Sequence, residues 1–527
     1  MNDTGKRVFG AAGMLVAAMA ISRILGYLRD VVIYAQFGQN RLTDAYNAAF
    51  SIPDFLYLLI VGGALSSAFI PVFSGYIAKE EHEEAWEVAW TVFHVVTGSM
   101  LLGIVVGMSF TPQLVNFLVP GFDAATKELT VLLTRIMFIQ AFFMALSGIS
   151  MAILNSHKHF LWPAVGSVLY NFGIIAVGYF LSRYYGIIGF SVGVVAGAMM
   201  YFAVQLPALK RTGMKYSFRL NLKHPGFRRI LLLILPVLIG MSANQINLFV
   251  NQMLASTLSG GLVAALRSGQ RLMMLPVGIF AVAIGVAIFP TLSEHAALEK
   301  IKDFKRMASL GLRTIFFVSL PSAAVLIVLR VPVIRFLFQQ GEFTKEATIA
   351  TSAALLFYAI GILGYASIQV LNRIFYALED TRTPVITSVT AMIVNIVLNF
   401  LLLESMGHRG LALAYSVAGI LNMVILIFLL WRKVGGMSFS RLTISFFQSM
   451  VGSIAAGLVS YTIAVSLERT LDMSYKLNQG LQVVSGMAAA VLVYFIISSL
   501  FKMEEASMAR QMLSRRMMRT KTGMRKQ

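Results

Sequence analysis

Residues 8–34 read VFGAAGMLVAAMAISRILGYLRDVVIY, an apolar run that nevertheless contains Arg23, Arg29 and Asp30. A helix of about 20 residues crosses the hydrocarbon core of a bilayer, so this stretch predicts a membrane-spanning helix. A charged side chain in that core costs at least ~3 kcal/mol, and such residues almost always face a protein interior or a water-filled cavity. The stretch therefore predicts a membrane protein with a cationic site inside the membrane.

The rest of the chain has the same apolar character. Of its 527 residues, 58% are hydrophobic and 13% are charged, whereas soluble domains carry about 25% charged residues. We expect an all-α polytopic membrane protein with fourteen transmembrane helices. The predicted spans are 8–34, 44–77, 87–110, 129–154, 161–182, 186–208, 230–256, 262–290, 308–330, 347–376, 384–404, 410–431, 443–466 and 480–501.

Basic residues predict the orientation of the chain. The net charge is +20, and Lys and Arg concentrate in the connection 210–229 and in the tail 510–527. Basic loops remain on the cytoplasmic side, so both termini are expected there. The first apolar segment is too long for a cleavable signal peptide, so we expect it to remain in the protein as a membrane-spanning helix. We expect the basic tail to contact anionic membrane lipids and not nucleic acid, which is the less favoured alternative.

The chain resembles itself at an offset of about 220 residues, which indicates an internal repeat. Residues 68–74 (AFIPVFS) resemble 287–293 (AIFPTLS), and the glycine pattern of 186–197 resembles that of 407–419. Because six is an even number of crossings, a repeat of six helices returns the chain to the side of the membrane on which it started. Two lobes of equal orientation are then expected around an axis near the membrane normal, with a substrate cleft between them.

The repeat defines four predicted parts. Residues 1–222 form an N-terminal lobe of six helices, and residues 223–432 form a C-terminal lobe of six. Helices 13 and 14, in residues 433–501, lie outside the repeat and serve either as lipid-facing padding or as a site for a lipidic cargo. Residues 502–527 form a basic cytoplasmic tail.

Four arginines are the candidate substrate-binding residues. Arg267 and Arg271 are four residues apart and share one helix face, whereas Arg23 and Arg29 are six apart and do not share a narrow face. Guanidinium groups stay charged and bind phosphate oxygens in pairs, so a diphosphate bridging the lobes is the simplest ligand for the set. The alternatives for each arginine are a structural ion pair or a side chain extended to the membrane surface.

Three carboxylates are candidates for gating or ion pairing. Asp30 follows Arg29 directly, and adjacent residues of a helix do not face each other. Asp44, at the start of the second span, is therefore expected to be the better partner across the turn. Asp54 follows Pro53, which kinks a helix in the middle of that span. Two interpretations are equally supported. In one, the kink belongs to a helix that bends during gating, with Asp54 as a proton site, and in the other the kink is static.

A polar face runs along the seventh span, where Asn244, Asn247 and Asn251 recur with helical spacing. Hydrogen bonding between helices is the favoured role of this face. Asn251 and Asp380 are also candidate residues of a cation site, although no spacing here is diagnostic of one. The histidines have no accompanying ligand set, so no metal site is predicted.

Missing motifs exclude several function classes. No GxxxxGK[ST] phosphate loop occurs, so ATP hydrolysis is not the expected energy source. The chain has 0 cysteines, which excludes disulfides and thiolate chemistry. Nothing resembles a catalytic triad or a pair of catalytic carboxylates. We expect a transporter without a cofactor, coupled to the membrane potential or to a gradient of H⁺ or Na⁺, and not an enzyme.

The motifs resemble one known family. Residues 22–30 (SRILGYLRD), 43–46 (TDAY), 68–71 (AFIP), 270–273 (QRLM) and 380–384 (DTRTP) are similar to segments of the MurJ (MviN) family, bacterial lipid II flippases of the MOP exporter superfamily. The similarity extends over nearly the whole chain. The motif of the first span is the most specific of the five.

The resemblance implies a fold, a cargo and site residues. Two six-helix lobes would enclose a cationic cavity, and two further helices would form a groove for the lipid tail. The cargo would be the undecaprenyl-pyrophosphate-linked peptidoglycan precursor, moved to the outer leaflet by alternating access. The family's essential arginines correspond to Arg23, Arg29 and Arg271, and its acidic residue after the first helix corresponds to Asp44.

The chain departs from its proteobacterial relatives at charged positions. Those relatives carry an arginine pair and a glutamate in the second helix, where this chain has Tyr57 and Gly62, and a glutamate where it has Met274. Arg267 and Arg373 are hypothesised to compensate. A flippase for another lipid-linked oligosaccharide is the main alternative function. A cation-coupled multidrug exporter is disfavoured, because cationic drugs need carboxylates and this chain offers arginines.

Overall fold

A computed structural model describes residues 3–62, 68–214, 217–436, 439–508 and 510–511. Every regular element in these residues is helical, which confirms the predicted all-α class. The chain divides into two compact units. Unit 1 comprises Met1–Ala264 and Gln340–Thr344, and unit 2 comprises Ala265–Gln339 and Lys345–Gln527. The predicted repeat boundary at residue 222 concerns sequence similarity, which packing does not test, and it stays a prediction.

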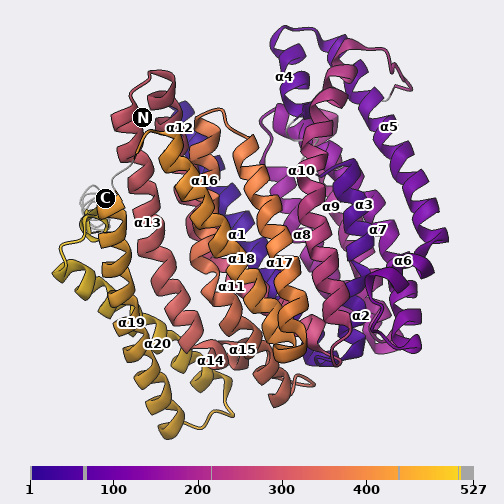
Figure 1. Cartoon of the computed structure of the whole chain (residues 1–527). Helices are drawn as coiled ribbons and strands as arrows, with labels where there is room; N and C mark the ends of the chain where they lie inside the picture. The colour runs from indigo at the N-terminus through magenta and orange to yellow at the C-terminus, as the bar shows by residue number, and fades with distance from the viewer. Residues whose placement is uncertain (1–2, 63–67, 215–216, 437–438, 509, 512–527) are drawn as a thin grey trace. The chain divides into compact units, whose positions relative to one another are not determined.

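The described residues of unit 1 form ten complete helices (Figure 1). They are α1 (Asp3–Phe37), α2 (Arg41–Ala49), α3 (Ser51–Ile60), α4 (Ile70–Ala78), α5 (His82–Ser109), α6 (Thr111–Leu118), α7 (Ala124–Ser156), α8 (Leu161–Tyr185), α9 (Ile188–Arg211) and α10 (Pro225–Ser256).

Small residues bring α8 and α9 of unit 1 close together. A Cβ on Gly173 would lie 2.7 Å from the Cα of Gly197, and one on Gly193 would lie 2.8 Å from the N of Gly178. In an apolar environment, helices associate by such close backbone approach and not by the hydrophobic effect. The pair α8–α9 then provides a rigid support against which α1 packs.

The second predicted span is broken into short helices. Asn40 caps α2, because its Oδ1 accepts hydrogen bonds from the N–H groups of Leu42 and Thr43. The chain breaks again at Phe50, before α3. The expected interruption near Pro53 is present. Pro53 lies in the first turn of α3, and because proline has no N–H to bond the carbonyl four residues earlier, the helix is broken ahead of it, at Phe50.

Unit 2 begins within α11 (Leu262–Pro276) and ends with the C-terminal segment. Its other elements are a π-helical turn at Val277–Ala281, then α12 (Val282–Ala297), α13 (Ile301–Val328), α14 (Arg330–Phe338), α15 (Lys345–Ile360), α16 (Ile362–Ala377), α17 (Arg382–Met406), α18 (His408–Lys433), α19 (Phe439–Thr470) and α20 (Lys476–Leu500). The π turn follows Pro276 directly. Because proline cannot donate to the helical ladder, the bonding register widens there.

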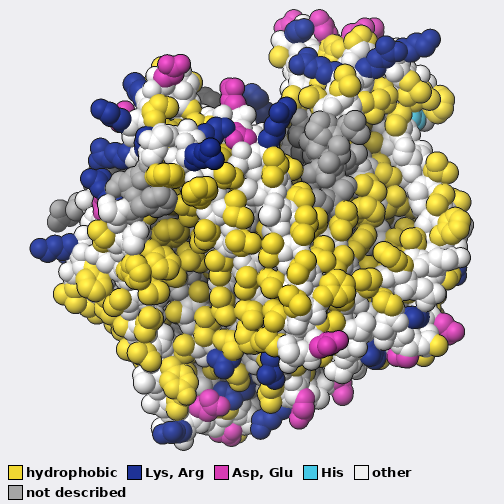
Figure 2. All heavy atoms as spheres, viewed as in Figure 1, with side chains coloured by type: hydrophobic (Ala, Val, Ile, Leu, Met, Phe, Trp, Pro, Cys, Tyr) yellow, Lys and Arg dark blue, Asp and Glu magenta, His cyan; other side chains and the backbone are white. Residues whose placement is uncertain are grey.

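Ten helices of the described residues are long and apolar enough to span a membrane, and the bent pair α15–α16 makes an eleventh. The bend is 44° and falls at Gly361, whose Cβ would lie 2.6 Å from the Oγ of Ser416. The remaining predicted spans correspond to α1, α2–α4 and α10. The count is consistent with fourteen spans. In Figure 2, hydrophobic side chains cover the visible flanks of the helices, and charged side chains gather near helix ends.

The last two helices of the chain pack within unit 2. α19 contacts both α13 and α20, and the Tyr494 hydroxyl on α20 donates to the carbonyl of Phe317 on α13 at 2.7 Å. At the opposite end of α20, the Lys476 ammonium donates to three carbonyls, those of Arg335, Phe336 and Gln339. Lys476 therefore satisfies carbonyls that the end of α14 leaves without helical partners.

Candidate functional site

Arg29 on α1 is held by two side chains of unit 1. Its Nε and Nη2 donate to Asp30 Oδ1 at 3.0 and 2.9 Å, and its Nη1 donates to Asn171 Oδ1 at 3.4 Å. The side chains of Arg29 and Asp30 are 12% and 14% exposed. The expectation that Asp30 cannot meet Arg29 was wrong. Their Cβ atoms diverge around the helix, but the long arginine side chain curls back far enough to reach its neighbour.

Asn171 on α8 connects this arginine to the helix support. Its Nδ2 donates to the carbonyl and hydroxyl oxygens of Ser22, both at 3.3 Å, and to the Ser167 carbonyl at 3.1 Å. Gly26 leaves room for the amide, because a Cβ there would lie 3.7 Å from Asn171 Oδ1. Sequence reasoning missed Asn171. The available signal was a lone buried amide in an apolar span, which usually hydrogen-bonds to a neighbouring helix.

Arg23 and Arg29 differ in their surroundings. Arg23 is exposed, whereas Arg29 is partly buried. This agrees with the prediction that two arginines six residues apart do not share one face. Within unit 1, the position of Arg29 is fixed by its partners and that of Arg23 is not.

Asp44 on α2 is fully buried and caps another helix. Its Oδ2 accepts from the Gly261 N–H at 2.6 Å, and its Oδ1 accepts from the Ala264 N–H at 2.9 Å. The Gly261 N–H lies directly before α11 and the Ala264 N–H lies in its first turn, where helical bonds leave such groups without partners. A carboxylate at a helix N-terminus is also favoured by the helix dipole. We expected Asp44 to form an ion pair across the turn, whereas in the structure it caps the start of α11.

Gly261 is required for that cap. Its φ is +87°, and a Cβ there would lie 2.4 Å from the carbonyl oxygen of Gln39. Only glycine tolerates both the left-handed backbone and so close an approach. Gly261 was not selected from the sequence, because a glycine before an apolar run is common and its φ is set by tertiary packing.

α11 carries Arg267 and Arg271, both partly buried, as is Met274 one turn beyond. In unit 2 the helix packs closely on α15, because a Cβ on Gly269 would lie 3.2 Å from the backbone N of Leu355. Gln270 hydrogen-bonds to the partly buried Tyr415. The backbone of α11 is thus fixed on either side of its arginines.

Arg373 on α16 has an aromatic partner in unit 2. Its guanidinium carbon lies 5.7 Å from the ring centroid of Phe289 on α12, within the range of a cation–π contact. Gly285, one turn earlier on α12, leaves room for the arginine stem at 3.3 Å. The hypothesis that Arg373 compensates for missing cavity charges stays a prediction.

The other candidate polar residues have local partners. Asn251 Nδ2 donates to the carbonyl and Oδ1 of Asn247 on the same helix at 2.7 and 3.1 Å. The side chain of Asn244 lies outside the described residues. Asp54 is exposed on α3, and the neighbouring Ser51 hydroxyl hydrogen-bonds to Gln252 of α10 at 2.7 Å. The gating role of Asp54 and the cation role of Asn251 stay predictions.

Asp380 stabilises the start of α17. It accepts from the Thr383 N–H at 2.9 Å, from the Thr383 hydroxyl at 2.7 Å and from the Lys433 ammonium. Partial burial raises the pKa of Asp380, but the hydrogen bonds from Lys433 and Thr383 outweigh it and lower the pKa to about 2. In the described part of the chain, no three His, Asp or Glu residues cluster as a metal site would require.

Comparison with known proteins decides the family. A family model described as "Lipid II flippase MurJ" matches residues 33–481. The chain belongs to the MurJ family. The lipid II flippase MurJ of Burkholderia cenocepacia is 32% identical over 451 residues, which cover 84% of this chain and 87% of that protein. Membership of this family confirms the expectation of a transporter and not an enzyme.

Solved structures agree with the MurJ assignment. A lipid II flippase MurJ in an inward closed conformation matches with a TM-score of 0.77 and 31% identity, over 92% of this chain and 98% of that one. An inward-facing multidrug resistance MATE transporter of the MOP superfamily matches with a TM-score of 0.66 and 14% identity, over 80% and 98% of the two chains. The second likeness concerns the fold alone and agrees with the MOP superfamily.

Proposed function

We propose that this protein is a flippase that moves lipid II, the undecaprenyl-pyrophosphate-linked peptidoglycan precursor, from the cytoplasmic to the outer leaflet by alternating access. Membership of the MurJ family carries this proposal. The placement of arginines on α1 and α11 supports it, because helices of this apolarity rarely carry cations without a polar ligand. This activity would make the protein necessary for cell wall synthesis and cell shape.

The proposed ligands of the diphosphate are Arg23, Arg29, Arg267 and Arg271. Guanidinium groups bind phosphate oxygens through paired, charge-assisted hydrogen bonds. Arg29 is already oriented by Asp30 and Asn171, which reduces the entropy lost when it binds an anion. Asp44 acts indirectly in this proposal, since it fixes the first turn of the helix that carries Arg267 and Arg271.

The remaining parts of the proposal concern the membrane. We place the protein in the bacterial cytoplasmic membrane with both termini in the cytoplasm, where its basic segments contact anionic lipids. The lipid tail of the cargo is assigned to α19 and α20, whose exposed residues include Leu458, Val484 and Val491. Movement is powered by the membrane potential or by H⁺ or Na⁺, and Asn251 and Asp380 remain the candidate cation residues.

The test is depletion of the protein in its own host, followed by measurement of lipid-linked intermediates in the inner leaflet. Lipid II is expected to accumulate there, and expression of the wild-type chain should restore its export. Accumulation of another lipid-linked oligosaccharide with normal lipid II would instead assign that oligosaccharide as cargo. Unchanged lipid pools with increased drug sensitivity would support the multidrug exporter.

A further inference from the structure

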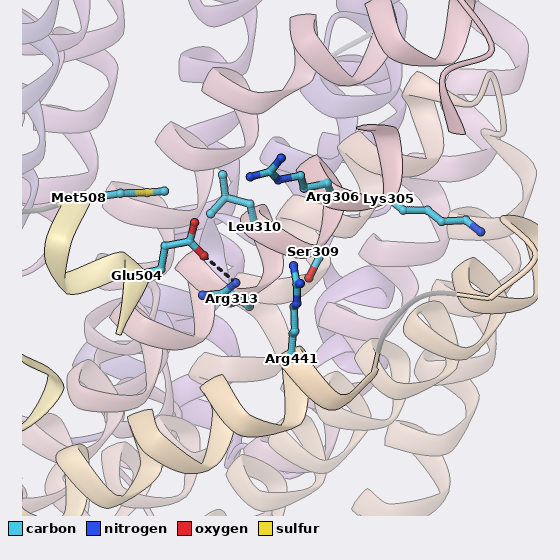
Figure 3. A pocket seen from close by; sticks show the side chains of 8 residues that line it. All are labelled: Lys305, Arg306, Ser309, Leu310, Arg313, Arg441, Glu504 and Met508. Carbon is cyan, nitrogen blue, oxygen red and sulfur yellow. Dashed lines mark hydrogen bonds and ion pairs between the residues drawn. The ribbon is translucent and has the colours of Figure 1, made fainter. Parts of the chain in front are cut away.

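A basic cavity in unit 2 is lined by none of the arginines of α1 and α11. It has a volume of 290 Å³ and is lined by residues of α13, α19 and the segment after α20 (Figure 3). The lining residues are Lys305, Arg306, Ser309, Leu310, Arg313, Arg441, Glu504 and Met508. Four of these side chains are cationic and one is anionic, so the cavity favours an anion.

The anionic side chains near the cavity, Glu504 and Glu505, both pair with the same cation, Arg313. Arg313 is 14% exposed, and it pairs with Glu504 at 3.0 Å and with the buried Glu505 at 2.7 Å. Among the described residues, neither Arg306 nor Arg441 pairs with a carboxylate. Figure 3 shows Arg441 extending from α19 toward Ser309 and Arg313 of α13. Two cations and a hydroxyl are therefore available to an incoming ligand.

An adjoining apolar surface favours a lipid over a soluble ion as the ligand of this cavity. Arg306 and Arg441 are exposed and lie within the first two turns of α13 and α19. α13 and α19 are both apolar enough to span the membrane. Ile444 and Phe447, within two turns of Arg441 on α19, are 56% and 52% exposed. An apolar surface suited to acyl chains thus adjoins the basic cavity.

We propose that this cavity binds the phosphate group of an anionic phospholipid of the cytoplasmic leaflet. Arg306, Arg441 and Ser309 contact the phosphate, and the acyl chains lie along the exposed face of α19. The cavity lies at the helix ends that the positive-inside rule assigns to the cytoplasm. Its volume is at the lower limit of ligand pockets, about 300 Å³, which suits a small headgroup and not a disaccharide peptide. The phospholipid bound in this cavity is therefore a different ligand from the transported cargo.

The test uses the purified full-length protein and native mass spectrometry, with phosphatidylglycerol, phosphatidylcholine or inorganic phosphate as the added ligand. Phosphatidylglycerol is expected to bind the wild type at least about tenfold more tightly than phosphatidylcholine. The variant R306Q/R441Q should weaken phosphatidylglycerol binding by about 30-fold, because each cation near an anionic lipid contributes about 1 kcal/mol. Arg313 is left unchanged because its carboxylate partners are structural.

The matched control is K300Q/K302Q, which removes the same charge from exposed residues near the start of α13 but outside the cavity. It should change phosphatidylglycerol affinity less than threefold, and the thermal midpoints of both variants should match the wild type. Equal affinity in R306Q/R441Q and the wild type would overturn the proposal, as would equal losses in the two variants. Displacement of phosphatidylglycerol by millimolar inorganic phosphate would instead assign the cavity to a soluble anion.

Discussion

At the scale of single residues, buried polar side chains fix the helices that carry arginines. Asp44 satisfies two N–H groups at the start of α11, and Asn171 joins α8 to Ser22 and Arg29 of α1. A buried polar group left without a partner costs about 1–3 kcal/mol. Substitutions at these positions are therefore expected to affect both stability and ligand binding.

Asp44→Ala should destabilise the protein and abolish complementation of a flippase-depleted strain. Loss of a helix cap costs about 1–2 kcal/mol, and the buried N–H groups of Gly261 and Ala264 would lose their acceptor. Asp44→Asn retains one acceptor oxygen and should be intermediate. Thermal unfolding of the purified variants measures the effect, with the exposed neighbour Leu42→Ala as control. A midpoint for Asp44→Ala equal to that of Leu42→Ala would contradict the capping role.

Asn171→Asp should keep the fold but weaken diphosphate binding by about tenfold. The substitution has nearly the same shape, yet it places a second carboxylate beside Arg29 and competes with an incoming anion. Binding of purified lipid II to the detergent-solubilised variant measures the change. Phe172→Leu, at an exposed neighbouring position of α8, is the control. If Asn171→Asp bound lipid II as tightly as this control, Arg29 would not contact the diphosphate.

At the scale of elements, prolines account for the breaks within two spans, and tertiary contacts set where other helices begin. The second span divides at Phe50, three residues before Pro53, and the π turn follows Pro276. Proline in the sequence indicated both breaks, because it lacks the N–H of the helical ladder. The start of α11 depends on a glycine conformation, and the start of α17 depends on an aspartate and a lysine.

Gly261→Ala should be more damaging than Gly260→Ala. An alanine at φ +87° is strained by about 1–2 kcal/mol, and its Cβ would lie 2.4 Å from the Gln39 carbonyl oxygen. At Gly260 the nearest atom is 3.0 Å away and belongs to the flexible Arg41 side chain. Thermal midpoints and protein yield compare the two variants. Equal midpoints would show that α11 can begin without the left-handed residue.

Asp380 should stabilise the protein in a pH-dependent manner. Its pKa in the folded state is about 2, below the ordinary value of about 3.9. The stabilisation is therefore complete above about pH 4 and is lost as the pH falls toward 2. The difference in thermal midpoint between the wild type and Asp380→Asn should be constant from pH 8 to 5 and shrink below 4. A difference that persists at pH 2 would rule out this linkage; Glu379→Gln is the exposed control.

At the scale of the whole molecule, the arginines proposed to bind the cargo are divided between the two units. Arg23 and Arg29 belong to unit 1, and Arg267, Arg271 and Arg373 belong to unit 2. Each unit has its own packed helices, so a single arginine can be removed without dismantling either one. The proposed function then predicts graded losses when the arginines are replaced singly.

Arg29→Ala and Arg271→Ala should each reduce lipid II affinity by about 10–100-fold and abolish complementation, because a charge-assisted hydrogen bond contributes about 1.5–3 kcal/mol. Arg23→Ala should do the same, since the family resemblance includes it. Arg267→Ala and Arg373→Ala test the compensation hypothesis. Normal growth of either strain would remove that arginine from the mechanism. Arg409→Ala, at the start of α18, controls for loss of charge.

The sequence by itself determined the class of protein, its family and the arginine-bearing spans, because apolar length, charge cost and contiguous motifs are local properties. Those predictions are confirmed for the helical fold, the membrane class and the MurJ family. Tertiary structure decided which partners the polar groups chose. Asp30 met Arg29, Asp44 capped α11, and Asn171 joined two helices, since side-chain reach and contacts between residues far apart in sequence cannot be read from spacing. The cavity around Arg306 and Arg441 likewise exists only because α13, α19 and the segment after α20 fold together.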